Sequence, residues 1–230
     1  MRLMLNLQDR KWHEFQIQTI FIVSKPIARS KDEYLNGDTP FVASGSMNNG
    51  VVKFCKPRRD EAIDRAGCIT VSPVDGSAFY QPIDFLGRGG AGSSILMLRS
   101  NLMNNYNGRF IARMVSQTCS KYTYGHMGNI KSIERERIML PINSCGKPDW
   151  QFMEEYIKER ETALIKRLRS FLNQRIAERE RERERENNWY FYYYSKMDSS
   201  KTGIHRESRK RQRYLCGRKS NRKYTIYHCW

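Results

Sequence analysis

Residues 37–51 read Gly-Asp-Thr-Pro-Phe-Val-Ala-Ser-Gly-Ser-Met-Asn-Asn-Gly-Val, and they specify more of the fold than any other part of the chain. The apolar run Phe41–Ala43 predicts a buried strand, and Pro40 suits its start because a strand's first N–H is dispensable. Small polar residues come directly after it: Ser44, Ser46, Asn48 and Asn49. Glycines between them permit tight turns. A strand therefore delivers amides and hydroxyls to one loop, and such groups hydrogen-bond both phosphates and base edges.

Charge is distributed unevenly along the chain. The formal net charge of +17 divides into +7 over residues 1–149, +1 over residues 150–187 and +9 over residues 188–230. The first part is thus less basic than the total suggests. A net charge of +7 still favours a polyanionic partner such as nucleic acid.

The cysteines give no sign of a metal site. Six are scattered through the chain without a C-x-x-C pair or a histidine at ligand spacing. Unpatterned cysteines fit a reducing compartment. There is no apolar run near the roughly 18 residues of a membrane span, and the first residues lack a secretory core. We therefore expect a cytoplasmic protein without a metal, a cofactor or a membrane segment.

The order of secondary-structure signals indicates an α/β (α+β-like) domain over residues 1–148. Strand patterns recur between turn residues, and one segment, 109–119, has helical spacing instead. The strand patterns are at 12–23, 39–43, 51–54, 68–72, 78–80, 94–98 and 138–142. We expect a mixed, curved sheet with one or two short helices.

Beyond Pro148 the pattern becomes that of one long amphipathic helix over residues 149–187. Asp149 is a suitable N-cap, and neither Gly nor Pro occurs before Gly203. The apolar stripe consists of Trp150, Met153, Ile157, Leu164, Leu168, Phe171 and Leu172. At 1.5 Å per residue the helix would be about 57 Å long, which exceeds a small domain. We expect a spacer that pairs with a partner helix as in a coiled coil, rather than a core helix.

These blocks together resemble the target recognition domain of type I restriction-modification specificity subunits and of their type IIB relatives. Besides residues 37–51, the resemblance lies in Trp12–Ile17 with Ile20–Phe21, Ile69–Val71 with Gly76–Gln81, Tyr122–Gly125, Ile138–Pro141 and Gly146–Glu154. It implies a DNA-reading subunit that carries no catalytic residues. It also implies spacer helices that pair antiparallel and dock methyltransferase subunits.

The segment Glu178–Glu186 alternates Glu and Arg, which places like charges at i,i+4 on a helix. A GAGAGA nucleotide tract encodes Glu-Arg in every reading frame, so slippage there alters only the residues encoded after the repeat. With permissible codons, residues 217–230 read in a neighbouring frame parallel residues 32–43. We hypothesise that residues 188–230, basic and aromatic, are a disordered or out-of-frame tail that derives from a second recognition domain. The hypothesis requires a GA repeat in the gene, with a recognition-domain frame beside it.

Four groups of side chains are candidates for DNA contact. They are the polar loop, a basic cluster, an arginine in a glycine-rich segment, and a Tyr/His loop with nearby lysines. The candidates are Ser44, Ser46, Asn48, Asn49, Lys53, Arg58, Arg59, Arg88, Lys121, Tyr122, Tyr124, His126 and Lys131. Two of these groups have a structural alternative: solvated surface for the basic cluster, and core packing for the two tyrosines. Gly87–Gly92 matches G-x-G-x-x-G, but a strand-like segment comes after it, so a loop is favoured over a cofactor site.

The sequence thus predicts a non-catalytic specificity subunit that recognises one half of a bipartite double-stranded DNA target. The implied partner is a methyltransferase (modification) subunit, with a restriction subunit and a second copy paired through the helix as further candidates. No methyltransferase Asn/Asp-Pro-Pro-Tyr/Phe motif or nuclease Asp…Glu-x-Lys set is present, and Asp75 after Pro73 fits a turn. Two alternatives stay open: a non-functional truncated fragment, and a free-standing nuclease or methyltransferase.

Overall fold

The computed structural model describes residues 5–90 and 94–199, which fall into two compact units divided between Ile165 and Lys166. Its strands are β1 (Trp12–Gln16), β2 (Ile22–Ser24), β3 (Asn36–Val42), β4 (Val51–Cys55), β5 (Cys68–Val71), β6 (Ala78–Gln81), β7 (Leu86–Gly87), β8 (Leu96–Arg99) and β9 (Arg137–Pro141). Its helices are α1 (Ile17–Ile20), α2 (Asn105–Cys119), α3 (Ile130–Arg135) and α4 (Trp150–Ser199), with single turns η1 (Leu7–Asp9), η2 (Lys31–Glu33) and η3 (Asn48–Gly50).

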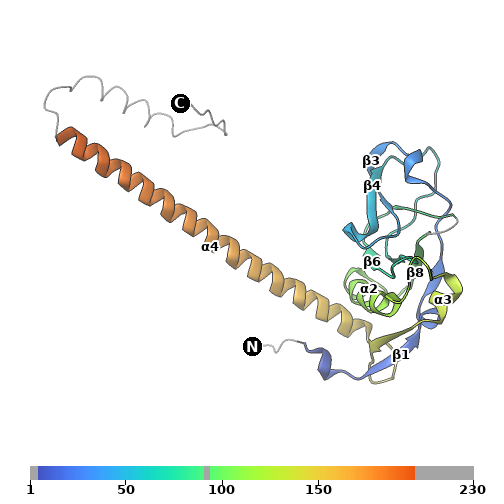
Figure 1. Cartoon of the computed structure of the whole chain (residues 1–230). Helices are drawn as coiled ribbons and strands as arrows, with labels where there is room; N and C mark the ends of the chain where they lie inside the picture. The colour runs from blue at the N-terminus through green and yellow to red at the C-terminus, as the bar shows by residue number, and fades with distance from the viewer. Residues whose placement is uncertain (1–4, 91–93, 200–230) are drawn as a thin grey trace. The chain divides into compact units, whose positions relative to one another are not determined.

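The strands form mixed sheets, which confirms the predicted α/β class. They are distributed over three sheets, with the orders β1-β9, β2-β8-β5-β6 and β4-β3-β7. All neighbours are antiparallel except β3 and β7, which are parallel. β3 and β4 lie side by side at one end of the first unit, while α2 lies beside β6 and β8 (Figure 1). Strand 12–23 of the prediction is interrupted, because α1 inserts one helical turn between β1 and β2.

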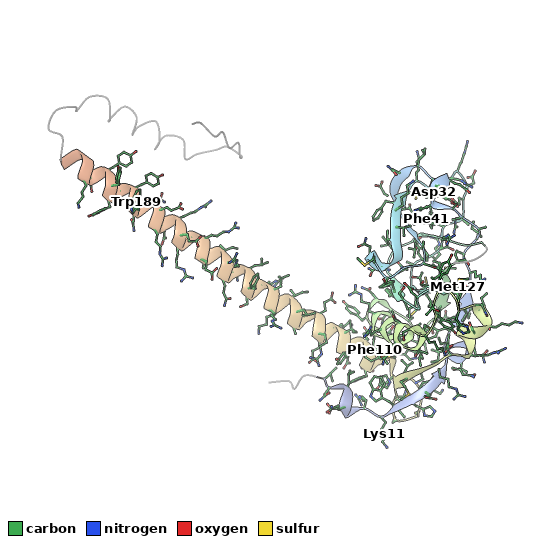
Figure 2. The ribbon with its side chains drawn as sticks, in the orientation of Figure 1. Lys11, Asp32, Phe41, Phe110, Met127 and Trp189 are labelled. Carbon is green, nitrogen blue, oxygen red and sulfur yellow. The ribbon has the colours of Figure 1, made fainter. Side chains whose placement is uncertain are left out.

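The largest core cluster forms where α2 packs on the sheets. The helix begins at Asn104, whose side chain accepts hydrogen bonds from the backbone N–H groups of Tyr106 and Asn107. Its apolar face buries Phe110, Ile111 and Val115 with residues of β5, β8 and β9. A separate cluster around Phe41 joins Tyr34, Cys55 and Leu86. Figure 2 shows Phe41 and Phe110 in different parts of the unit, so the β3-β4-β7 sheet has its own small core.

The predicted partner stripe of α4 divides into two parts. Met153 is fully buried in the main core cluster, and Trp150 and Ile157 pack against that cluster. These three residues therefore belong to the domain's own core and not to a partner surface. Leu164, by contrast, is 66% exposed.

Polar contacts fix the first turns of α4 to the domain as well. Glu154 accepts a 2.6 Å hydrogen bond from the side chain of Asn104, and Glu159 accepts one of 2.7 Å from the backbone N–H of Leu5. Arg160 donates to the Leu5 carbonyl at 3.0 Å. The helix is therefore part of the domain over its first turns. The sequence pattern shows that this side of α4 is apolar, but it does not show whether the domain itself or a partner covers the first turns.

The helix is also longer than predicted, because it ends at Ser199 instead of near residue 187. No Gly or Pro interrupts this segment, and aromatic residues stack one turn apart along it. Trp189 stacks on Tyr193 with ring centroids 5.3 Å apart, and Tyr190 on Tyr194 at 6.5 Å. Asn188–Ser199 is thus helical, and the rest of the predicted tail, residues 200–230, lies outside the described residues.

An ionic network around buried Arg29 joins β7 to the segments before and after the β3–β4 hairpin. Arg29, 6% exposed, contacts Glu61 at 2.8 Å and Asp64 at 2.6 Å, and it donates to the Gly87 carbonyl at 3.1 Å. Asp64 accepts from the Gly87 N–H at 2.9 Å, and Tyr34 donates to Glu61 at 2.6 Å. Burial acts to raise the pKa of Glu61, but the hydrogen bonds that it accepts, including those from Tyr34 and Arg29, lower it.

Replacing Arg29 should destabilise the fold strongly. Arg29→Leu leaves two partly buried carboxylates, whose side chains are 9% and 13% exposed, without their buried cation, so we expect the free energy of unfolding to fall by about 3–5 kcal/mol. Urea denaturation followed by circular dichroism measures the change. Arg65→Ala is the matched control, because the Arg65–Asp84 pair is exposed and should contribute less than about 1 kcal/mol. Equal effects of the two substitutions would contradict this role of Arg29.

Candidate nucleic-acid interface

Parallel pairing of β3 with β7 brings two predicted site elements to the same edge of a sheet. Val42 pairs with Gly87 at the carboxyl ends of the two strands. Residues 43–50, here called the Asn loop, come after β3, and Arg88 comes after β7. The backbone N–H of Arg88 donates to the Val42 carbonyl at 2.7 Å. Arg88 therefore lies at the entrance to the Asn loop, as a DNA-contact site that uses both would require.

The Asn loop presents polar side chains at the surface. Ser46, Asn48 and Asn49 are exposed, and Ser44 is half-buried and makes interactions of its own. Asn48 and Asn49 have φ values of 49° and 55°, in the left-handed region that asparagine tolerates better than most residues. Gly50 is next, with φ 76°, and a Cβ there would lie 3.0 Å from the Ala43 carbonyl oxygen. The turn therefore depends on asparagine and glycine at these positions.

Two side chains from the neighbouring β5–β6 hairpin contact the Asn loop. The hydroxyl of Ser77, whose single hydrogen is shared with Asp75, lies 2.9 Å from the carbonyl oxygen of Gly45. The side-chain amide of Gln81, which is 3% exposed, donates to the carbonyl of Asn49 at 3.1 Å. Neither Ser77 nor Gln81 is among the site residues that the sequence predicts. The sequence marks Gln81 only as a polar residue directly after a predicted strand. Its partner Asn49 is 32 residues away in sequence, so the contact itself could not be predicted.

A third loop lies next to the same hairpin. Residues 122–128, here called the Tyr124 hairpin, are closed by a 2.9 Å hydrogen bond from the His126 N–H to the Thr123 carbonyl. Gly128 donates to the carbonyl of Pro73, in the turn between β5 and β6, at 2.9 Å. That turn thus contacts the Asn loop through Ser77 and the Tyr124 hairpin through Pro73. Tyr124 is 81% exposed at the tip, and Met127 of the same hairpin is labelled in Figure 2.

Tyr122 lies in the core, which is the alternative to DNA contact that the sequence left open for it. Its ring is 3% exposed, and its hydroxyl donates to Glu136 at 2.5 Å. Burial, together with this hydrogen bond, raises the pKa of Tyr122 to about 12. The ring stacks on exposed His126 with centroids 6.2 Å apart, so it supports the hairpin from below. Of the two tyrosines, only Tyr124 is available for contact with DNA.

Lys53 and Arg58 of the basic cluster both contact Tyr34, which precedes β3. Lys53 pairs with Phe41 in the β3–β4 hairpin, and its ammonium group donates to the Tyr34 carbonyl at 2.6 Å. Arg58 and Arg59 come after β4, at the opposite end of the hairpin from the Asn loop. Arg58 forms an ion pair with Glu33, which raises the pKa of Arg58, and it lies 5.0 Å from the Tyr34 ring. Arg59 is almost fully exposed.

Two further lysines lie around the Tyr124 hairpin. Lys121 precedes it and forms a 2.7 Å ion pair with Glu136, and Lys131 is exposed in the first turn of α3. The structure thus brings the Asn loop and the Tyr124 hairpin to the β5–β6 turn and places Arg88 at the entrance to the Asn loop, whereas the charged ends of Lys53 and Lys121 contact Tyr34 and Glu136. It does not bring Arg58 and Arg59 to this place.

The structure also bears on other kinds of site: a nuclease carboxylate, a cofactor loop, a metal site and a membrane span. Asp75 accepts hydrogen bonds from the backbone N–H and hydroxyl of Ser77 at 3.1 and 2.7 Å, so it caps a turn, as predicted. The glycine-rich segment leads into β8 and not into a helix. Within residues 5–90 and 94–199, no group of three potential metal-ligating side chains is close enough to hold an ion. The helices of the same residues include none with the length and apolar character of a membrane span.

Comparisons with known proteins agree with the resemblance in the sequence. The specificity subunit S.BcgI of the type II restriction enzyme BgcI from Heyndrickxia coagulans is 27% identical over 169 residues, covering 70% of this chain and 47% of that protein. The S subunit of a type I restriction-modification system from M. genitalium has a TM-score of 0.47 and 14% identity, covering 73% of this chain and 42% of that one. The HsdS subunit from Thermoanaerobacter tengcongensis has a TM-score of 0.44 and 17% identity, with coverages of 68% and 39%.

The chain spans about half the length, or less, of these relatives. The family described as type I restriction modification DNA specificity domain matches residues 9–174, which include every strand of the structure and the first turns of α4. This match confirms the resemblance that the sequence blocks indicated, and the chain belongs to that family.

Proposed function

We propose that this chain recognises one half of a bipartite double-stranded DNA target for a restriction-modification system. The observation that carries the proposal is that the Asn loop and the Tyr124 hairpin both contact the β5–β6 turn, with Arg88 at the entrance to the Asn loop. Amides and a phenol hydrogen-bond base edges, whereas arginine and lysine contact phosphates or guanine. The β5–β6 hairpin supports the loops from a rigid sheet, which suits a surface that must match a defined base sequence.

The chemistry of the system would come from other subunits. In this proposal the chain is not catalytic, and a methyltransferase (modification) subunit that uses S-adenosylmethionine acts at the site that the chain selects. A restriction subunit would join in a full complex, in the cytoplasm where the DNA is. Family membership supports this role, since the family is defined by DNA specificity and not by a reaction.

The exposed part of α4 supports pairing with a second helix. Leu164, Leu168, Phe171, Leu172 and Ile176 are between 48% and 66% exposed. Such a stripe on a helix is stabilised when another apolar face covers it. A second copy of the chain, paired through this stripe, would carry a second recognition domain and would specify a palindromic bipartite site.

Selection of binding sites tests the DNA-reading role. The full chain with its cognate modification subunit should enrich one short motif from a random duplex library. Asn48→Gly and Asn49→Gly tolerate positive φ and delete only the carboxamides, so each should lower the preference for that motif about tenfold if the amide reads a base. Competition binding with specific and non-specific duplexes gives the ratio.

Arg59→Ala is the control, since Arg59 lies at the other end of the β3–β4 hairpin and should leave the preference unchanged. Enrichment of no motif by the wild-type chain would reject the proposal. Cleavage or methylation of DNA by the chain alone would instead support a free-standing enzyme.

The pairing of α4 is tested by mass in solution. Size-exclusion chromatography with light scattering should show a dimer of the full chain, and Leu168→Glu should convert it to a monomer because the charge would be buried at the interface. Ser170→Glu is the matched control, since at 100° per residue Ser170 lies on the opposite face of the helix. A wild-type chain that stays monomeric at all concentrations, with the modification subunit also present, would exclude pairing.

A further inference from the structure

The Asn loop contains a backbone conformation that its own sequence does not readily maintain. Asn48, Asn49 and Gly50 have successive φ values of 49°, 55° and 76°. L-residues visit the left-handed region as single residues, because the Cβ approaches the neighbouring carbonyl oxygen. Two successive asparagines there are strained, and strained backbone persists only where surrounding structure holds it. A contact from outside the loop would therefore help to hold this conformation.

Gln81 is in the right place to make that contact. Its side-chain nitrogen carries two hydrogens, and one is donated to the Asn49 carbonyl at 3.1 Å and the other to the hydroxyl of Thr70 at 2.8 Å. Thr70 belongs to the central strand β5, and Gln81 is 3% exposed. The amide is therefore fixed by the sheet on one side and binds the turn on the other. Within the loop, hydrogen bonds from Gly50 to Met47 at 2.8 Å and from Ala43 to Gly50 at 2.9 Å close the turn.

We propose that Gln81 is a positioning residue that sets the sequence preference of the interface by fixing the backbone of Asn48 and Asn49. The inference rests on the proposed function, because it concerns how the Asn loop reads bases. Holding the Asn49 carbonyl fixes the peptide group between Asn49 and Gly50 and, through it, the directions in which both asparagine side chains leave the turn. Without the hydrogen bond, other turn conformations become accessible and the two amides no longer face the DNA in one arrangement.

The consequence differs from that of losing a phosphate contact. Gln81 itself is buried and uncharged, so its removal leaves the charge of the surface unchanged. Affinity for non-specific DNA depends on cations and counterion release, and it should therefore be retained. The preference for the correct motif depends on the geometry of uncharged groups, and it should be lost.

The test uses Gln81→Met in the full chain with its modification subunit, since methionine has a similar length and no N–H donor. We expect the ratio of specific to non-specific affinity to fall about tenfold, while non-specific affinity and its salt dependence change less than about twofold. Thr70→Ser is the matched control. It keeps the hydroxyl that accepts from Gln81 and removes only a methyl group from the same part of the core, so it should keep the ratio within about twofold.

Hydrogen exchange of the same proteins without DNA separates this proposal from the proposed function. The amide of Gly50 should exchange faster in Gln81→Met than in wild type, and at the wild-type rate in Thr70→Ser, which keeps the hydroxyl that holds Gln81. The double variant Gln81→Met/Thr70→Val leaves no unpaired hydroxyl in the core and repeats the test should the single variant unfold. If the wild-type chain enriches no motif, the proposed function fails, and the exchange still reports whether Gln81 holds the loop. If Gln81→Met selects the wild-type motif with an unchanged ratio, the positioning role is overturned.

Discussion

Two backbone registers, Phe41 with Leu86 and Val42 with Gly87, place the ends of β3 and β7 side by side, and the candidate interface depends on that pairing. β7 has only two residues, so it makes few hydrogen bonds to β3. The Arg29–Asp64 pair adds two more hydrogen bonds to β7: Asp64 accepts from the N–H of Gly87, and Arg29 donates to its carbonyl. An ionic network in the interior thus determines where Arg88 meets the Asn loop at the surface.

The sequence was sufficient to predict the strands and helices whose apolar residues recur at a regular spacing. The strands at β4, β5, β6 and β9 and the helix α2 can be predicted from alternating or helical spacing of apolar residues. The single turn α1 was missed inside a segment that looked like one strand, although Ile17 and Phe21 have helical spacing and both are buried. β7 could not be predicted, since it exists only through pairing with a strand more than forty residues earlier in the sequence.

The Asn loop could be predicted from composition, because serine, asparagine and glycine after a strand favour a polar turn independently of distant contacts. The remaining candidates depended on contacts distant in sequence. Tyr122 is in the core because Glu136 satisfies its hydroxyl there, and a sequence cannot show which tyrosine of a pair finds such a partner. Arg58 and Arg59 come after β4, whereas the Asn loop precedes it, so the extended strand β4 separates the two arginines from the loop. The long helix was predicted from its stripe, but the docking of its first turns required the structure.

Charge alone would not make this surface selective. Lys53, Arg58 and Lys121 each contact an acceptor of the protein itself, so part of their attraction for phosphate is offset within the fold. Cations held in this way lower the affinity for any DNA, which weakens binding at wrong sites as much as at the right one. Selectivity must then come from uncharged groups in a fixed geometry. A rigid polar turn, supported by a buried amide on a sheet, meets that requirement better than a larger number of basic side chains would.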